Sequence, residues 1–213
     1  MHLRKRTAAF TLLELLVVVA IIAVLIGILV PTLSNAQITS RRTACQATLK
    51  GIGAGFQEYI QQNDWLMPDG AIVPSLDGAP PRPPGHMPLP LGLAAEVTSP
   101  NAWRCSADNK GYISWATGQF YPSYFAGEGI SFAYNARMGG QKIEKTRMFQ
   151  NFGYQAVPEM YVLYDFDNFH GPAGDPKAKN VLYADWHVGT VKDIFDAAGI
   201  IPSSPTQPAT QPY

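Results

Sequence analysis

The stretch AAFTLLELLVVVAIIAVLIGILVP, residues 8 to 31, decides the architecture of this chain. Its apolar part runs over residues 10–30, and 21 helical residues at about 1.5 Å each cover roughly 30 Å, the thickness of the hydrocarbon layer of a bilayer. One acidic residue, Glu14, interrupts the run. The stretch therefore predicts a membrane-spanning helix over residues 10–30 that carries a single carboxylate.

The residues before the apolar run form a short basic leader, residues 1–9. Residues 4–6 are all basic, and such a cluster keeps the N-terminal flank of a membrane segment in the cytoplasm. The small pair Ala8 and Ala9 stands before the apolar run, whereas the cleavage site of a secretory signal peptide follows it. Cleavage at this pair would remove only the leader and would leave the hydrophobic helix on the mature protein.

The segment RTAAFTLLELL, residues 6 to 16, resembles the processing site of type IV prepilins and of the pseudopilins of type II secretion. The resemblance implies cleavage by a prepilin peptidase between Ala9 and Phe10, methylation of the new Phe10 amine, and assembly of the helix into a filament core. The family usually has glycine where this chain has Ala9. Pro31 is residue 22 of the expected mature chain, where these pilins often carry a proline that kinks the helix.

The resemblance also supplies a partner for Glu14, the fifth residue of the expected mature chain. An acid in mid-bilayer costs about 2.5–3.5 kcal/mol, less near a helix end, and such residues are usually retained for a partner. The implied partner is the cationic amine of Phe10 on a neighbouring subunit, which would favour docking at one axial register. The alternative is a tolerated interfacial acid in a plain membrane anchor.

The helix is expected to continue beyond the membrane as an amphipathic half, residues 31–63. Five apolar residues recur there at steps of 4, 3, 4 and 3, which is one face of an α-helix: Cys45, Leu49, Ile52, Phe56 and Tyr59. We expect this stripe to pack on a globular body. Three glycines between residues 51 and 55 are poor helix formers, so they allow either close backbone contact or local melting.

The region 64–110 is a proline-rich loop region, and it contains the second of two cysteines, Cys105. Beyond the membrane a disulfide with Cys45 is permitted, although two buried free thiols fit the same sequence. The segments CQATLKGIGAGFQEYIQQNDWLMP (45 to 68) and WRCSAD (103 to 108) are similar to bacterial pilin-like proteins that carry a C-terminal processing-associated motif. A bridge would tie the helix to the body and contribute about 2–4 kcal/mol.

Residues 111–200 are expected to form a β-rich globular domain, and 201–213 a disordered tail rich in Pro, Ser, Thr and Gln. Short aromatic and β-branched runs predict antiparallel strands within residues 111–115, 129–134, 160–166, 180–186 and 187–191. In MYVLYDF, residues 160 to 166, alternation places Met160, Val162, Tyr164 and Phe166 on the expected core face. The fold class is thus α+β and pilin-like, a long N-terminal helix packed on a small antiparallel sheet domain.

Acidic and histidine side chains gather near the end of this domain. Five of them are candidate ligands for a structural ion: Asp165, Asp167, His170, Asp185 and His187. An oxygen-rich set of this kind suits Ca²⁺, and two histidines with several aspartates also suit Zn²⁺. Turn-forming aspartates and surface histidines are the plainer interpretation.

The closing segment NVLYADWHVGTV, residues 180 to 191, resembles the end of the processing-associated motif in degenerate form. Trp186 stands where the motif has glycine in a turn that requires positive φ. We therefore expect either a different turn type or a bulge that displaces Trp186.

The sequence predicts a structural filament subunit with no catalytic residues, not an enzyme, in protein secretion or pilus biogenesis. The expected partners are prepilin peptidase and other pilin-like subunits. The expected location is the bacterial inner membrane, as a single-pass protein with a cytoplasmic N-terminus and a periplasmic or extracellular C-terminal domain. Sixteen basic and 16 acidic residues give no net charge, which offers no support for nucleic-acid binding. The alternative is a membrane-anchored extracytoplasmic metal-binding domain or hydrolase.

Overall fold

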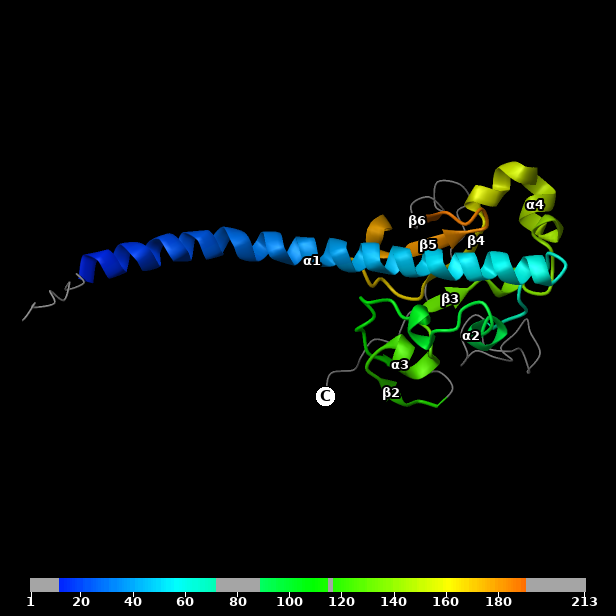
Figure 1. Cartoon of the computed structure of the whole chain (residues 1–213), viewed down its shortest axis with the longest axis horizontal. Coiled ribbons are helices and arrows are strands. Elements are labelled where there is room, and N and C mark those ends of the chain that lie inside the picture. The colour runs from blue at the N-terminus through cyan, green and yellow to red at the C-terminus, as the bar shows by residue number, and fades with distance from the viewer. Residues whose placement is uncertain (1–11, 72–88, 115–116, 191–213) are drawn as a thin grey trace, which may run out of the picture. The chain divides into compact units, whose positions relative to one another are not determined.

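The fold is α+β, as the sequence predicts: a long N-terminal helix precedes two small antiparallel sheets in a pilin-like arrangement (Figure 1). The computed structural model describes residues 12–71, 89–114 and 117–190. The long helix, α1 (Leu12–Gln62), is shared between two compact units, the first ending at Ser40 and the second beginning at Arg41. Each unit is described by itself below.

The described part of the first unit is the N-terminal portion of α1. All its residues from Leu12 to Ser40 are exposed, although most of those up to Val30 are aliphatic. An 18-residue window of α1 reaches a mean hydropathy of 3.2, and α1 is the one helix among the described residues that is long and apolar enough to cross a membrane. A helix that could span a membrane is therefore present from Leu12 onward.

The second unit holds the rest of α1 and the body. A four-stranded antiparallel sheet has the order β3-β4-β5-β6, and a separate hairpin pairs β1 with β2. The strands are β1 (Tyr112–Ile113), β2 (Phe120–Tyr121), β3 (Phe132–Tyr134), β4 (Tyr161–Asp165), β5 (Asn180–Tyr183) and β6 (Val188–Thr190). Each predicted strand segment contains one of these, whereas β2 escaped prediction because its two residues form no apolar run.

Short helices connect these strands. The α-helices after α1 are α2 (Leu89–Gly92), α3 (Tyr124–Glu128) and α4 (Arg147–Phe152). The 3₁₀ helices are η2 (Pro100–Trp103), η3 (Ala136–Met138), η4 (Ile143–Lys145), η5 (Gly153–Glu159) and η6 (Pro176–Ala178). With strands of at most five residues, the body depends on side-chain packing more than on long hydrogen-bond ladders.

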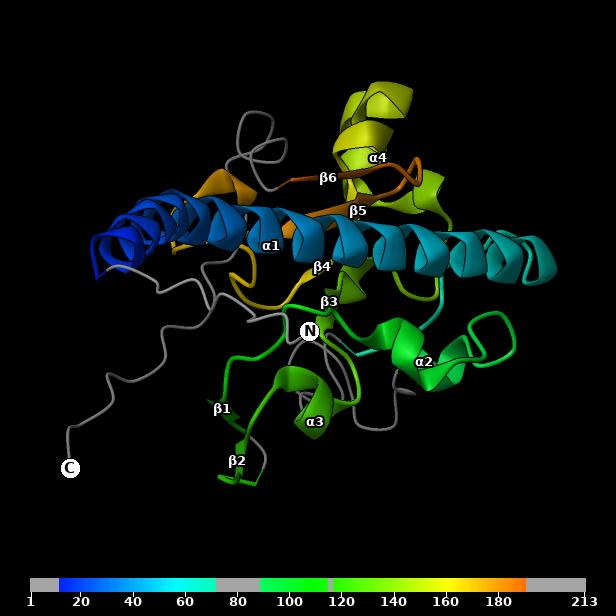
Figure 2. The ribbon, with the colours of Figure 1, turned by 60° about the vertical axis from the view of Figure 1, so that its left-hand side comes forward.

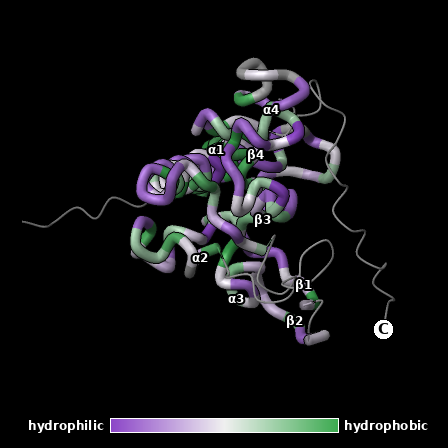
Figure 3. The backbone as a smooth tube through the Cα atoms, turned by 90° about the vertical axis from the view of Figure 1, so that its right-hand side faces the viewer, coloured by the Kyte–Doolittle hydropathy of each residue, from purple (hydrophilic) through white to green (hydrophobic). Residues whose placement is uncertain are grey.

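The predicted stripe of α1 forms the centre of the core, where the helix crosses β4 and β5 (Figure 2). Cys45, Leu49, Ile52 and Phe56 are buried, and Tyr59 is half-buried against the same cluster. The tube is green, hence hydrophobic, beside the β4 label in Figure 3. The amphipathic prediction is confirmed, since a period of 3.6 residues places these side chains on one face.

Phe56 lies at the middle of this interface. Its ring centroid is 5.9 Å from that of Tyr134 and 6.1 Å from that of Trp186, with both pairs stacked. The side chain is 0% exposed. Aromatic pairs at such distances add about 0.5–1.5 kcal/mol to the effect of burial alone. One residue of α1 therefore joins β3 to the β5–β6 turn.

The three glycines leave α1 unbroken, and two of them permit close packing. A Cβ on Gly53 would lie 3.0 Å from Leu182 Cδ1, and one on Gly55 would overlap Val97 Cγ2. A Cβ on Gly51 would meet nothing within 4 Å. Close approach of the body to the helix thus explains Gly53 and Gly55, while Gly51 has no such constraint.

This difference predicts opposite effects of the same substitution. Gly51→Ala should raise the free energy of unfolding by about 0.5–1 kcal/mol, because alanine is the better helix former. Gly55→Ala should lower it by up to about 2 kcal/mol, because overpacking against Val97 exceeds that gain. Denaturant unfolding of the two variants in detergent micelles measures both shifts, and shifts of the same sign would contradict the assigned packing.

The predicted alternation of β4 is wrong at Leu163 and Tyr164. A register shift lies between Tyr161 and Leu163 where β4 pairs with β5, so Val162 and Leu163 both enter the main core. Tyr164, expected on the core face, packs with Tyr161 on Val181 and Tyr183 instead, whereas Phe166 packs on the main core as predicted. An extra residue in one strand disturbs the alternation, and no local pattern in the sequence marks that position.

Trp186 itself adopts the backbone conformation expected of glycine, with φ 69°. Its N–H donates to the Tyr183 carbonyl at 2.9 Å, and the Tyr183 N–H donates to the His187 carbonyl at 3.0 Å. These bonds close a three-residue turn whose last position is left-handed. The turn therefore differs in type from a two-residue Asp-Gly turn, as one of the expected alternatives states, and the indole stacks on Phe56.

Candidate functional site

The two cysteines are joined in a disulfide, Cys45–Cys105, with Cα atoms 5.0 Å apart. Both are 0% exposed. Cys45 belongs to α1 and Cys105 to the segment after η2, so the bond links helix and body across a sequence separation of 60. Cys45 Sγ also lies 3.6 Å from the hydroxyl of Ser106, an exposed residue.

A buried acid and histidine lie beside this disulfide. His170 Nε2 is 3.2 Å from Asp165 Oδ2 and 3.5 Å from Cys105 Sγ. Asp165 ends β4, and its Oδ2 also accepts the Asn180 backbone N–H at 2.7 Å. Burial raises the pKa of the Asp165 carboxyl, while His170 and the Asn180 amide act in the opposite direction. Two of the five predicted ligands are thus neighbours.

Lys179 lies near this pair. Its ammonium donates to the Phe166 carbonyl at 3.0 Å and stands 5.9 Å from the centroid of the Tyr164 ring. Burial lowers the pKa of the Lys179 amine, and the charges of Asp167 and Asp165 oppose that change. A cation is therefore held close to the buried carboxylate.

The other three predicted ligands lie elsewhere. Asp167 is 3.6 Å from Lys110 Nζ and accepts the hydroxyl of Tyr124 at 3.3 Å. Asp185 and His187 form a pair of their own, Oδ1 to Nδ1 2.5 Å, in the exposed β5–β6 turn. His187 also stacks on Tyr183 with centroids 4.3 Å apart.

The expected convergence of the five ligands is therefore wrong. Strands β4 and β5 do pair, but their antiparallel register places Asp165 beside Asn180 and places Ala184 beside Met160. Asp165 and Asp185 consequently stand at opposite ends of β5. Among the described residues, the one group of metal-ligand side chains with ligand atoms all within 4.8 Å is Cys45, Cys105 and His170.

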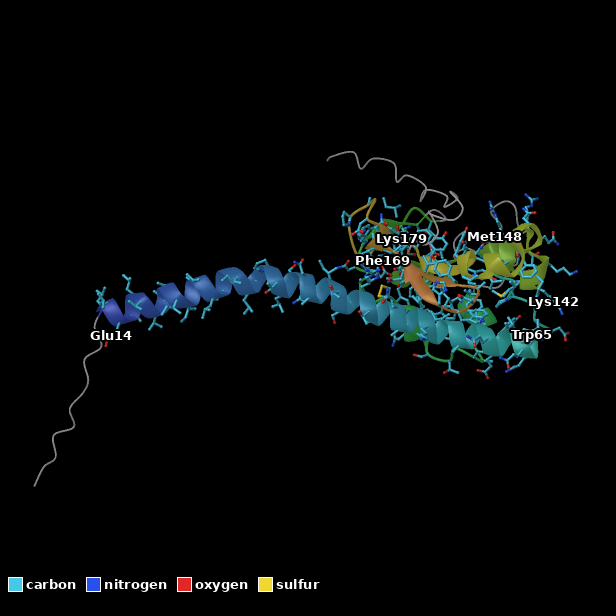
Figure 4. All side chains as sticks on the ribbon, turned by 90° about the horizontal axis from the view of Figure 1, so that it is seen from above. Glu14, Trp65, Lys142, Met148, Phe169 and Lys179 are labelled. Atoms are coloured by element: carbon cyan, nitrogen blue, oxygen red, sulfur yellow. A yellow bond between two sulfur atoms is a disulfide. The ribbon has the colours of Figure 1, made fainter. Side chains whose placement is uncertain are left out.

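At the other end of α1, Glu14 lies in the first turn of the helix (Figure 4). The positive end of the helix dipole favours an acid there. The aliphatic side chains around and after Glu14 are exposed, with values such as 72% for Leu13 and 57% for Leu15. Ala9 and Phe10, the predicted cleavage and methylation residues, lie outside the described residues.

Pro31 lies inside α1 and the helix continues through it. Proline has no N–H, so the hydrogen bond to the carbonyl four residues earlier is missing. The hydroxyl of Thr32 donates to the carbonyls of Ile28 at 3.3 Å and of Leu29 at 2.8 Å, one and two residues beyond that gap. Side-chain hydrogen bonds within the helix thus lie next to the missing backbone bond.

Comparison with known proteins gives one match, and it falls on this segment. Residues 4–30 match the prokaryotic N-terminal methylation motif. The N-terminal segment is thus similar to that of prepilin-like proteins. No curated protein and no solved structure matches the chain.

The match covers residues 4–30, and none of the comparisons matches the body. Methylation of this kind acts on a chain start that cleavage has exposed, so the motif supports a substrate of prepilin peptidase. The pilin-like helix that follows is the single candidate membrane span among the described residues. The motif therefore gives no information on the function of the body.

Sequence reasoning missed the surroundings of Asp165 and His170. His170 and Cys105 are 65 residues apart, and nothing near either residue indicates that they meet. Asn180 and Lys179 begin a strand and look like ordinary edge residues in the sequence. Only the antiparallel pairing of β4 with β5 brings them to the carboxylate.

Proposed function

We propose that this chain is a structural filament subunit that prepilin peptidase cleaves between Ala9 and Phe10 and methylates on the Phe10 amine. Its hydrophobic helix then assembles with other pilin-like subunits, in protein secretion or pilus biogenesis. The observation that carries the proposal is the match of residues 4–30 to the N-terminal methylation motif, at the head of a helix whose aliphatic side chains are exposed.

The exposed helix needs an apolar environment. Side chains from Leu12 to Val30 are exposed all around the helix, whereas an amphipathic surface helix would bury one face. At about 25 cal/mol per Å² of apolar surface, so large an exposed area is incompatible with water. A bilayer before assembly and the core of a filament after it both satisfy this requirement.

Glu14 gives the assembly its register. The proposed partner of the carboxylate in the filament is the amine that cleavage exposes at Phe10 of a neighbouring subunit. Subunits that meet head to tail in this way extend without closing, which generates an open filament. The pairing is favourable at one axial offset, because a shift of one helical turn moves the carboxylate by about 5.4 Å.

The same features support a location. The basic residues 4–6 favour a cytoplasmic N-terminus, with the body on the far side of the bacterial inner membrane. A disulfide between Cys45 and Cys105 suits that oxidising side. A membrane-anchored metal-binding domain or hydrolase, the alternative, receives no support from the five predicted ligands, which do not gather at one place.

Mass spectrometry of the protein from cells with and without prepilin peptidase tests the proposal. With the peptidase, the protein should lose residues 1–9 and gain one methyl group on Phe10. Without it, the leader should remain. Ala9→Gly, which restores the residue usual in the family, should be processed at least as completely as the wild type.

Two outcomes would overturn the proposal. The first is a leader that stays intact while the peptidase cleaves a known prepilin in the same cells. The second is removal of the leader at an equal rate without the peptidase, which would indicate an ordinary signal peptidase or an unrelated protease.

A further inference from the structure

The buried group of Cys45, Cys105 and His170 has no role in the filament assembly proposed above. Its ligand atoms lie within 4.8 Å of one another, and all three residues are buried. Asp165 adds a fourth donor, since its Oδ2 is 3.2 Å from His170 Nε2. Two sulfurs and a nitrogen thus meet at one place in the second unit, and the carboxylate lies next to them on the His170 side.

We propose that the chain with its disulfide reduced binds one zinc ion through Cys45, Cys105, His170 and Asp165. Two thiolates with an imidazole and a carboxylate form a donor set that zinc accepts, whereas Ca²⁺ requires oxygen ligands. The site differs from the predicted five-residue set because it uses both cysteines and leaves Asp167, Asp185 and His187 out. It requires only the second unit and is independent of filament assembly.

The distances suit a tetrahedral ion. With Zn–S of about 2.3 Å and Zn–N and Zn–O of about 2.0 Å, a tetrahedron has S···N edges of about 3.5 Å and N···O edges of about 3.3 Å. The corresponding separations here are 3.5 Å from Cys105 Sγ to His170 Nε2 and 3.2 Å from His170 Nε2 to Asp165 Oδ2. The two sulfurs must move apart to about 3.8 Å and the Asp165 carboxylate must turn toward them, and side-chain rotation supplies both movements once the bond is broken.

Unpartnered atoms provide independent support. Asp165 Oδ1 and His170 Nδ1 are buried, and neither has a hydrogen-bond partner among the described residues. Both side chains are 0% exposed. Nδ1 lies on the ring edge away from the proposed ligand atom Nε2, so the support comes from the carboxylate. Buried polar atoms are nearly always satisfied, so a free acid oxygen next to His170 indicates a place that a cation would complete. Asp165 can then bind the ion through one oxygen or both.

The charges also balance. Two thiolates and one carboxylate bring three negative charges to Zn²⁺ and leave a net charge of −1. The neighbouring ammonium of Lys179, whose charge acts on Asp165, offsets that excess. A buried site with no net charge avoids most of the desolvation cost of an unpaired ion.

The metal and the disulfide exclude one another. Zinc binding displaces one proton from each thiol. When the disulfide forms, the two thiolates give two electrons to the disulfide of a thiol-oxidising protein, which becomes a dithiol, and Zn²⁺ is released. Before oxidation, the ion would therefore hold α1 on the body at the position where the covalent bond later does.

Cobalt and zinc titration of the full-length protein in detergent micelles tests the proposal. The protein is reduced with a phosphine, freed of reductant without oxygen, and titrated with Co²⁺. One equivalent should give the near-ultraviolet thiolate-to-cobalt absorption and the strong visible bands of a tetrahedral ion, which Zn²⁺ then removes. The oxidised protein should give neither signal.

Two histidine variants separate a built site from general metal binding. His170→Ala should weaken binding by more than the 10- to 100-fold that loss of an outer partner typically costs, so by more than about 100-fold. His187→Ala, in the exposed turn, should bind as the wild type does. Asp165→Asn should lose about 10-fold or more, because an amide oxygen is a poor zinc ligand.

Folding is checked on the oxidised form of each variant, whose circular dichroism should match that of the wild type. A variant that fails this check is replaced by a second measurement, protection of the reduced wild-type thiols from alkylation by zinc. Absence of cobalt absorption in the reduced wild type, equal binding by the two histidine variants, or alkylation unaffected by zinc would each refute the site.

Discussion

Glu14→Ala is expected to reduce incorporation into filaments by about 100-fold or more while the protein still inserts into the membrane. Removal of one partner from a buried ion pair leaves the other charge uncompensated, at a cost of about 3–5 kcal/mol. Here the uncompensated group is the Phe10 amine of the neighbouring subunit. Membrane insertion should improve slightly, because the apolar stretch of residues 10–30 loses its one acid. Immunoblots of the sheared-filament fraction and of the membrane fraction measure the amount of protein in each, and the ratio of the two amounts gives the degree of incorporation.

The matched control for this variant is Leu13→Ala, which shortens an adjacent exposed side chain and keeps the charge. It should assemble nearly as the wild type does. Glu14→Gln, which keeps the shape and loses the charge, should behave like Glu14→Ala. Normal assembly of Glu14→Gln would show that the carboxylate has no counter-charge in the filament, and the proposed register would have to be abandoned.

Phe56→Ala is expected to lower the free energy of unfolding by about 3–5 kcal/mol, the range for truncation of a fully buried aromatic side chain. Phe56 is 0% exposed and stacks on Tyr134 and Trp186, so its loss opens a cavity between α1 and the sheet. The cost should fall near the upper end of the range, since two ring contacts are lost together. Denaturant unfolding of the oxidised protein in micelles, followed by tryptophan fluorescence, measures it.

Glu58→Ala provides the control on the same helix. Glu58 is exposed and lies two residues away, so the change should stay within about 0.5 kcal/mol. Phe56→Leu should fall between the two, because it keeps most of the buried volume. If Phe56→Ala and Glu58→Ala were equally mild, the stripe of α1 would not be the centre of the core.

The parts of the fold that sequence predicted are those that local periodicity determines. The stripe from Cys45 to Tyr59 follows from the helical period alone. The prediction of a membrane-spanning helix over residues 10–30 follows from the length of the apolar run. The bulge in β4 does not follow from periodicity, because one extra residue changes which side chains face the core without changing the composition. The separation of Asp165 from Asp185 likewise depends on strand register, which the sequence of either strand leaves open.

Trp186 illustrates a second limit. The sequence indicates a turn with a left-handed residue, and on steric grounds a tryptophan there predicts a distorted turn. The structure keeps the turn because the indole gains a contact with Phe56, 130 positions earlier in the chain. A distant contact thus decides a local conformation, and no window of sequence around the turn contains it.

The bond between Cys45 and Cys105 has a mechanical consequence. If the chain assembles as proposed, withdrawal of the hydrophobic segment from the bilayer pulls along α1, and the tension reaches Cys45 before it reaches Leu49, Ile52 or Phe56. From Cys45 it can pass through a covalent link into the body. The non-covalent packing farther along the helix then bears less of the force, and the helix and the body move together as one unit.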